Sequence, residues 1–208
     1  MQLDVIIDVV CPWCYIGKRR VDALREAAPN IDFKVIYRPF FLAPNMPKEG
    51  KDRRQHFAEK FGPDADLKKM SEGLLSQAGD IDFQFDRIER VPNTMDAHRL
   101  IAWSANENAQ EAVVEAVFQA YFTDGRDIGD AHVLTDIAAQ AGLQTDVVKD
   151  LLASEQDVDR ISAAAMQATG MGIQGVPFYI FAGAVGLSGA QPVEVLLQAA
   201  EKAGQAAA

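Results

Sequence analysis

The hydrophobic pattern predicts strands at both ends of the chain and helices through its long middle section. Residues 3–10 are short, apolar and rich in β-branched side chains, which is typical of a buried strand despite two aspartates. Residues 31–38 alternate apolar and polar positions, which predicts a second strand. Residues 15–27 have helical spacing and precede Ala28, where we expect the helix to end. Strand, helix and strand within about 35 residues predict a βαβ unit with parallel strands.

Prolines interrupt the pattern at residues 39–47, which predicts a loop. A helical period then continues to about residue 168, and cap residues and glycines mark where helices begin and end. Residues 81–88 predict a short extended segment within this section. The expected helices span residues 51–61, 64–78, 94–106, 109–123, 131–141, 146–153 and 157–169.

The strand pattern returns near the carboxyl end. Residues 176–181 and 184–188 flank a turn at Ala182-Gly183 and predict a hairpin, and residues 191–203 predict an amphipathic helix. Neither end completes a sheet alone, so one α/β domain interrupted by a helical insertion explains the order of elements best. We expect residues 1–45 and 169–208 to form that domain and residues 46–168 to form the insertion.

Composition and charge narrow the function. Apolar residues make up 49% of the 208 residues, and no apolar run is long enough to span a bilayer, so we expect no membrane partner. A net charge of −10 argues against a nucleic-acid partner. The amino terminus lacks the features of a secretory signal, which predicts a cytoplasmic protein if Met1 is the natural start. The alternative is a processed form that carries a new initiator Met.

The chain has two cysteines, Cys11 and Cys14, in one Cys-x-x-Cys motif. Such a pair serves redox chemistry, forms half of a zinc site, or is inert. Zinc needs two more ligands, and the three histidines, His56, His98 and His132, show no paired ligand spacing. We therefore expect no metal.

The position of the motif favours redox chemistry. Cys11 falls where a strand ends and a helix begins, so we expect it to be the N-cap, with Pro12 in the first helical position. Unpaired N–H groups and the helix dipole favour a thiolate there. Cys14 follows on the same helical face, close enough for a disulfide. The spacing predicts that Cys11 attacks and Cys14 resolves, while Trp13 shapes the exposed surface around the sulfurs.

Two neighbouring features leave alternatives open. Asp8, three residues before Cys11, either relays protons to or from Cys14 or is a solvated or hydrogen-bonded carboxylate at a strand end. Pro177 at the start of a strand is ordinary when considered alone.

Three segments together carry a resemblance to a known family: 11–17 (CPWCYIG), 93–100 (NTMDAHRL) and 188–192 (SGAQP), with Gly-Val-Pro-Phe at 175–178. The chain resembles the DsbA-like thioredoxin-fold oxidoreductases, specifically their FrnE branch, over nearly its whole length. The resemblance implies that Pro177 is cis and packs beside the cysteines as part of the catalytic site. It also implies that Val176 offers backbone groups to an extended substrate strand, with Pro12 and Trp13 beside it.

The same superfamily supplies a rival function. The 2-hydroxychromene-2-carboxylate isomerases and kappa-class glutathione transferases use bound glutathione and typically carry a serine in place of Cys11, without a second cysteine. They also have an acidic residue and an arginine in the loop that here reads Gly189-Ala190-Gln191. The chain departs from them at both places, so we expect glutathione as a passing substrate at most. A non-catalytic binding or chaperone module is a third alternative, favoured only by unreactive cysteines.

The sequence thus predicts a thiol–disulfide oxidoreductase that acts on protein or peptide thiols and disulfides through Cys11 and Cys14. It predicts no tightly bound cofactor. The direction of the reaction and the redox partner stay open.

Overall fold

The computed structural model describes residues 1–206 of a chain that separates into two compact units. Within the described residues, the first unit comprises 1–42 and 159–206, and the second comprises 43–158. The second unit ends at residue 158, ten residues before the expected end of the insertion at residue 168. The difference arises because the helix at residues 158–170 belongs to the first unit. Ala168 of that helix packs in one hydrophobic core with Ile6.

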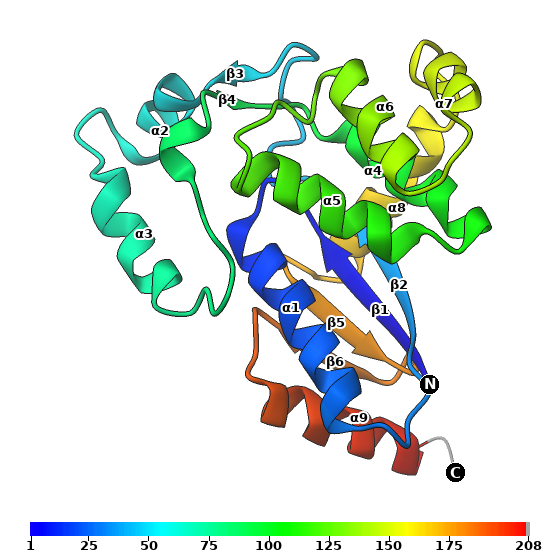
Figure 1. Ribbon diagram of the computed structural model, residues 1–208. Helices are drawn as coiled ribbons and strands as arrows, with labels where there is room; N and C mark the ends of the chain where they lie inside the picture. Colours follow the sequence, from blue (N-terminus) through cyan, green and yellow to red (C-terminus); the bar gives the residue numbers. More distant parts are fainter. Residues whose placement is uncertain (207–208) are drawn as a thin grey trace. The chain divides into compact units, whose positions relative to one another are not determined.

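The first unit contains a four-stranded sheet in the order β2-β1-β5-β6 (Figure 1). Strand β1 (Gln2–Ile7) pairs in parallel with β2 (Lys34–Pro39), and helix α1 (Pro12–Ala27) connects them. On its other edge β1 pairs antiparallel with β5 (Phe178–Phe181), which forms a hairpin with β6 (Val185–Ser188). The predicted βαβ and ββα segments are confirmed, and both segments share one sheet.

Helices cover both faces of this sheet. Cross-strand neighbours Ile6 and Phe178 point to the face covered by α8 (Val158–Gly170), where they meet Ala168. Because successive strand residues point to opposite faces, Tyr179 points to the other face, where it meets Gly17 of α1. Helix α9 (Val193–Ala206) packs beside α1 (Figure 1). The result is the thioredoxin fold that the sequence predicts.

The second unit is mainly helical. Its buried centre is α5 (Gln110–Phe122), whose Val113, Val117 and Phe118 are fully buried. Two short strands, β3 (Lys51–Asp52) and β4 (Arg90–Val91), pair antiparallel. The other helices are α2 (Arg53–Phe61), α3 (Leu67–Leu75), α4 (Met95–Ser104), α6 (Ala131–Gln140) and α7 (Thr145–Leu152). Within residues 1–206, none of the helices has the length and apolar character needed to cross a membrane.

The prediction of an extended segment at residues 81–88 is wrong. The segment contains a 3-10 turn at Phe85–Arg87, and the short strand β4 follows it instead. The alternating apolar residues pack their aromatic rings instead. The Phe83 and Phe85 rings stack with their centroids 5.1 Å apart, and the Phe83 and Phe122 rings make a T-shaped contact with centroids 5.4 Å apart. Since Gln84 donates its N–H to the Phe122 carbonyl, the segment follows the end of α5 and has no strand ladder.

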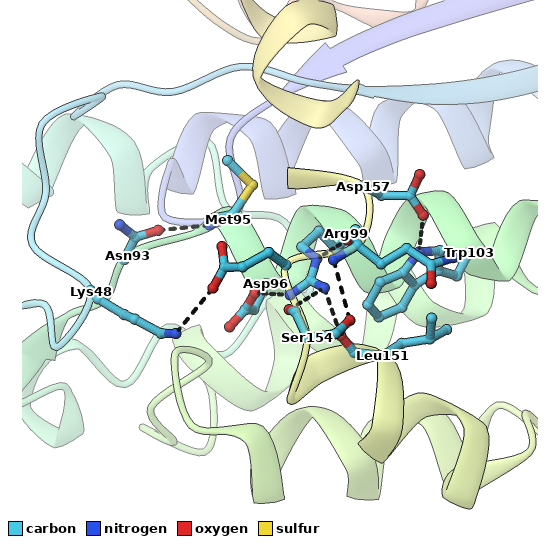
Figure 2. A network of polar contacts seen from close by, with 11 residues as sticks. Lys48, Asn93, Met95, Asp96, Arg99, Trp103, Leu151, Ser154 and Asp157 are labelled. Atoms are coloured by element: carbon cyan, nitrogen blue, oxygen red, sulfur yellow. Dashed lines mark hydrogen bonds and ion pairs between the residues drawn. The ribbon is translucent and has the colours of Figure 1, made fainter. Parts of the chain in front are cut away.

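A buried arginine fastens the connection between α7 and α8 (Figure 2). Arg99 of α4, which is 1% exposed, donates hydrogen bonds to the carbonyl oxygens of Leu151, Ser154 and Gln156 at 2.6–2.8 Å. Its remaining terminal nitrogen lies 2.7 Å from the Asp96 carboxylate. A planar guanidinium can donate hydrogen bonds to several oxygens at once. Arg99, which lies in the 93–100 segment, therefore has a structural role.

Candidate active site

The Cys-x-x-Cys motif lies where β1 gives way to α1, as predicted. Cys11 is the N-cap of α1, with φ −92° and ψ 111°, and Pro12 occupies the start of the helix. The Cys11 N–H donates to the Asp8 carbonyl at 3.0 Å, and the Cys14 N–H donates to the Cys11 carbonyl at 2.9 Å. Cys11 is therefore the residue at the positive end of the α1 dipole.

The two thiols have unequal environments. Both are free, but Cys11 is 6% exposed and Cys14 is completely buried. Burial raises the pKa of the Cys14 thiol well above its ordinary value, and a side-chain hydrogen bond with Cys11 and the charge of Cys11 raise it further. Cys14 is thus held as a protonated thiol that touches the Cys11 sulfur.

The Val176–Pro177 segment reaches the cysteines from the far end of the sequence. The Val176–Pro177 peptide bond is cis, as the resemblance implies. The Cys11 thiol donates a hydrogen bond to the Val176 carbonyl oxygen at 3.6 Å. Pro177 itself is buried, whereas Val176 keeps partial exposure. The structure therefore brings these two predicted site residues to Cys11.

The sequence did not predict two residues of this site, Gly17 and Tyr179. A Cβ atom at position 17 would lie 2.9 Å from Pro177 Cγ and closer still to the Tyr179 hydroxyl. Tyr179 is completely buried, and its hydroxyl has no hydrogen-bond partner among residues 1–206. Burial raises the pKa of Tyr179, and the charge of Cys14 raises it further. A glycine inside a helical pattern was the available signal, because it costs helix stability and usually has a packing reason.

Asp8 is buried at the edge of the site. Its side chain is 1% exposed, and its carboxylate accepts a hydrogen bond from the Leu42 N–H at 2.8 Å. The carboxylate is therefore hydrogen-bonded rather than solvated, which is one form of the second alternative for Asp8. Its charge raises the pKa of Cys14, while its backbone hydrogen bond to that thiol lowers it. Asp8 and the Cys14 thiol therefore interact electrostatically.

The remaining predicted residues, Pro12 and Trp13, lie between the two cysteines at the start of α1. Trp13 is 38% exposed between the two cysteines, and Pro12 is half-buried before it. Among residues 1–206, no three histidine, cysteine, aspartate or glutamate side chains gather as they would around a metal ion. The site therefore combines the exposed ring of Trp13 with one slightly exposed cysteine and one completely buried cysteine.

A strand-end dithiol inside a thioredoxin fold defines a class of redox proteins, and comparison with known families agrees. The family model described as the DSBA-like thioredoxin domain matches residues 2–201. The chain therefore belongs to the DsbA-like family of thiol–disulfide oxidoreductases.

Individual relatives extend this finding. The crystal structure of a probable DsbA oxidoreductase from Streptomyces coelicolor is 31% identical, with a TM-score of 0.88 over 99% of this chain and 90% of that one. An uncharacterized protein of Bacillus subtilis, YwbO, is 28% identical over 77% of this chain and 76% of its own length.

Two more distant structures share the fold alone. A 2-hydroxychromene-2-carboxylate isomerase is 16% identical, with a TM-score of 0.71 over 100% of this chain and 96% of the isomerase. The cytosolic disulfide reductase DsbM from Pseudomonas aeruginosa, described with GSH, is 18% identical, with a TM-score of 0.66 over 98% of this chain and 95% of DsbM. The fold is therefore common to both rival functions, and the residues of the site must separate them.

Proposed function

We propose that the protein exchanges thiols and disulfides on protein or peptide substrates through Cys11 and Cys14. The Cys11 thiolate attacks a substrate disulfide, forms a mixed disulfide and releases one substrate thiolate. Cys14 then loses its proton and attacks the Cys11 sulfur, which releases the second substrate thiolate and leaves a Cys11–Cys14 disulfide. Two electrons pass from the dithiol to the substrate, and the reverse sequence oxidises a substrate dithiol. The chemistry needs no metal and no tightly bound cofactor.

The observation that carries this proposal is the contact between two unequal thiols. Cys11 has the helix terminus that favours its anion, and Cys14 is buried and hydrogen-bonded to the Cys11 sulfur. A nucleophile and a resolving thiol need this division of roles, because only the first must meet the substrate.

Substrate binding falls to the surface around Cys11. Val176 keeps partial exposure and presents its carbonyl at the Cys11 sulfur, where an extended peptide would add as a strand. Pro177 has no N–H to donate, so it leaves the neighbouring backbone groups to the substrate. Pro12 and the exposed face of Trp13 would pack against the peptide on the other side of the sulfur.

Proton transfer to and from Cys14 falls to Asp8 in this proposal. Cys14 must lose its proton before it attacks Cys11, and its raised pKa means that a base has to accept it. The buried Asp8 carboxylate interacts with this thiol, while the Leu42 N–H holds it in place.

Glutathione-dependent isomerisation is the second candidate, and one observation favours each side. The fold of the 2-hydroxychromene-2-carboxylate isomerase covers 100% of the chain, and that of DsbM with GSH covers 98%. Against a dedicated glutathione pocket, the loop at 189–191 carries neither an acidic residue nor an arginine. Arg20 of α1 donates a hydrogen bond to the Ala190 carbonyl within this loop. We therefore propose glutathione as a thiol substrate without a dedicated pocket. The third candidate function is a binding or chaperone module whose cysteines do not react.

Single-cysteine variants separate these candidates. The wild-type protein should reduce or form a peptide disulfide without glutathione, and both Cys11→Ser and Cys14→Ser should lose turnover. Cys14→Ser should accumulate a mixed disulfide between Cys11 and the peptide. Glutathione-dependent isomerisation retained in Cys14→Ser would establish the second candidate instead. Unreactive thiols in the wild-type protein would establish the third.

A further inference from the structure

Tyr179 is a buried titratable group that the mechanism above does not use. It lies in β5 opposite Val5 of β1, and Tyr37 of β2 lies on the other side of the same Val5. Both tyrosines therefore project toward the face of the sheet that α1 covers. Tyr179 is fully buried and its hydroxyl has no hydrogen-bond partner among the described residues. A buried hydroxyl in that condition costs free energy and calls for a functional or structural reason.

The Tyr179 hydroxyl points at the active-site helix. It lies against the Cα of Gly17, beside the ring of Pro177, in space that any side chain at position 17 would fill. Cys14 precedes Gly17 by three residues and so shares its helical face. The charged groups that act on the hydroxyl are Cys14 and Arg20 of α1 and Cys11 at its N-cap, and Cys14 has the largest effect of the three.

The bonding of the Cys14 sulfur changes during the reaction. As a thiol it donates to the Cys11 sulfur, and the Asp8 backbone is its other hydrogen-bond partner. When Cys11 enters a mixed disulfide and Cys14 loses its proton, the buried Cys14 sulfur becomes an anion that needs donors. A buried thiolate with too few donors is costly, because desolvation disfavours the charged form.

We propose that the Tyr179 hydroxyl donates a hydrogen bond to the Cys14 sulfur while that sulfur is a thiolate, and so stabilises the anion that resolves the mixed disulfide. The proposal rests on the dithiol function above. The proton of Cys14 goes to Asp8, the Cys14 thiolate attacks the Cys11 sulfur, and the substrate thiolate leaves. Tyr179 keeps its own proton throughout, because burial favours the neutral phenol.

The experiment measures the two thiol steps separately with dithiobis-nitrobenzoate, an aryl disulfide that releases a coloured thiolate at each step. The first release reports attack by Cys11 and depends on reagent concentration. The second reports attack by Cys14 on the mixed disulfide and is independent of that concentration. Tyr179→Phe removes only the hydroxyl, and Tyr37→Phe is the matched control from the same row of the sheet.

Tyr179→Phe should slow the second release about tenfold and leave the first within about twofold, since hydrogen bonds to charged groups are worth this much. Tyr37→Phe should leave both unchanged. Equal second-release rates in Tyr179→Phe and Tyr37→Phe would overturn the proposal while leaving the dithiol function intact. A wild-type protein that shows no second release would instead overturn the dithiol function itself.

A second measurement follows the Tyr179 ring with its hydroxyl in place. The four tyrosines are labelled at Cζ and followed by NMR as the pH rises through ionisation of Cys14. The Tyr179 signal, assigned by exclusion with Phe variants of the other three, should shift with Cys14, and Cys14→Ser should abolish the shift. A Tyr179 signal that ignores Cys14 ionisation would contradict the proposal.

Discussion

Gly17 packs directly against the ring of Pro177, so that a Cβ atom at position 17 would lie 2.9 Å from Pro177 Cγ and 3.2 Å from Pro177 Cβ. Contacts this short require one of the partners to move. Because Pro177 follows Val176, whose carbonyl holds the Cys11 thiol, movement here is transmitted to the reactive sulfur. The absence of a side chain at Gly17 therefore allows α1 and the Val176–Pro177 segment to approach this closely.

Gly17→Ala should destabilise the protein and impair disulfide exchange. Alanine favours a helix over glycine by about 1 kcal/mol, but overpacking at a rigid proline ring costs about 1–3 kcal/mol, so the loss should prevail. Gly73 of α3 is the control, since no described atom lies within 4 Å of a Cβ there. Gly73→Ala should raise the free energy of unfolding by about 0.5–1 kcal/mol. Urea unfolding measures both, and equal stabilisation by the two substitutions would show that the Gly17 contact is relaxed at little cost.

The stability of the reduced protein should depend on pH through Cys14. Its folded-state pKa is raised above the ordinary 9.0, so the native state holds this proton more tightly than the unfolded chain does. The contribution is fully present below the unfolded value and is lost as the pH rises through the folded one. The free energy of unfolding should therefore fall above pH 9.0, and Cys14→Ser should reduce that slope. Cys11→Ser is the control; a slope in Cys14→Ser as steep as in Cys11→Ser would contradict the prediction.

Asp8→Asn should slow the resolving step at neutral pH. Loss of the Asp8 charge makes the Cys14 thiolate easier to form, yet asparagine accepts no proton, so the two effects have opposite signs. A relay predicts slower turnover, by about tenfold or more for a lost general base. Asp4→Asn is the control from the same strand, because its carboxylate pairs with Arg38 away from the sulfurs. Faster turnover in Asp8→Asn would show that Asp8 acts only through its charge.

Arg99→Lys should loosen the connection between α7 and α8. Lysine keeps the charge but has no planar fork, so buried carbonyl oxygens lose donors at a cost of about 1–3 kcal/mol. Arg126→Lys is the control, since the Arg126–Asp136 ion pair is at the surface and should matter by less than about 1 kcal/mol. Urea unfolding gives the difference, and amide exchange should accelerate in residues 151–157. Equal effects of both substitutions would remove the structural role of Arg99.

Much of the fold follows from local patterns. The strands on either side of the active-site helix and in the carboxyl-terminal hairpin are short and rich in β-branched residues, and cap residues mark most helices. The hydrophobic period and the capping residues therefore predict both kinds of element. The segment at 81–88 failed because Phe83 and Phe85 alternate for aromatic stacking, and alternation alone does not reveal whether a partner strand exists. The sequence also assigned α8 to the helical insertion, whereas the helix belongs to the first unit. A helical period does not reveal which hydrophobic core the apolar face of a helix joins.

The site divides in the same way. Cys11 as N-cap follows from its position before Pro12, whereas the complete burial of Cys14 has no signal in the local pattern. The contact between Gly17 and Tyr179 joins residues far apart in the sequence, and no local rule predicts it. Tyr179 resembles any other apolar strand position until its buried hydroxyl is placed against α1.

The most direct test of the central claim is the equilibrium of the reduced protein with glutathione redox buffers. The Cys11–Cys14 pair should undergo one reversible two-electron transition, with a potential between about −120 and −270 mV, the range of thioredoxin-fold dithiol enzymes. Both thiols should disappear together, and Cys11→Ser and Cys14→Ser should each abolish the transition. Thiols that stay independently titratable across the whole buffer range, without forming an intramolecular disulfide, would contradict the dithiol mechanism.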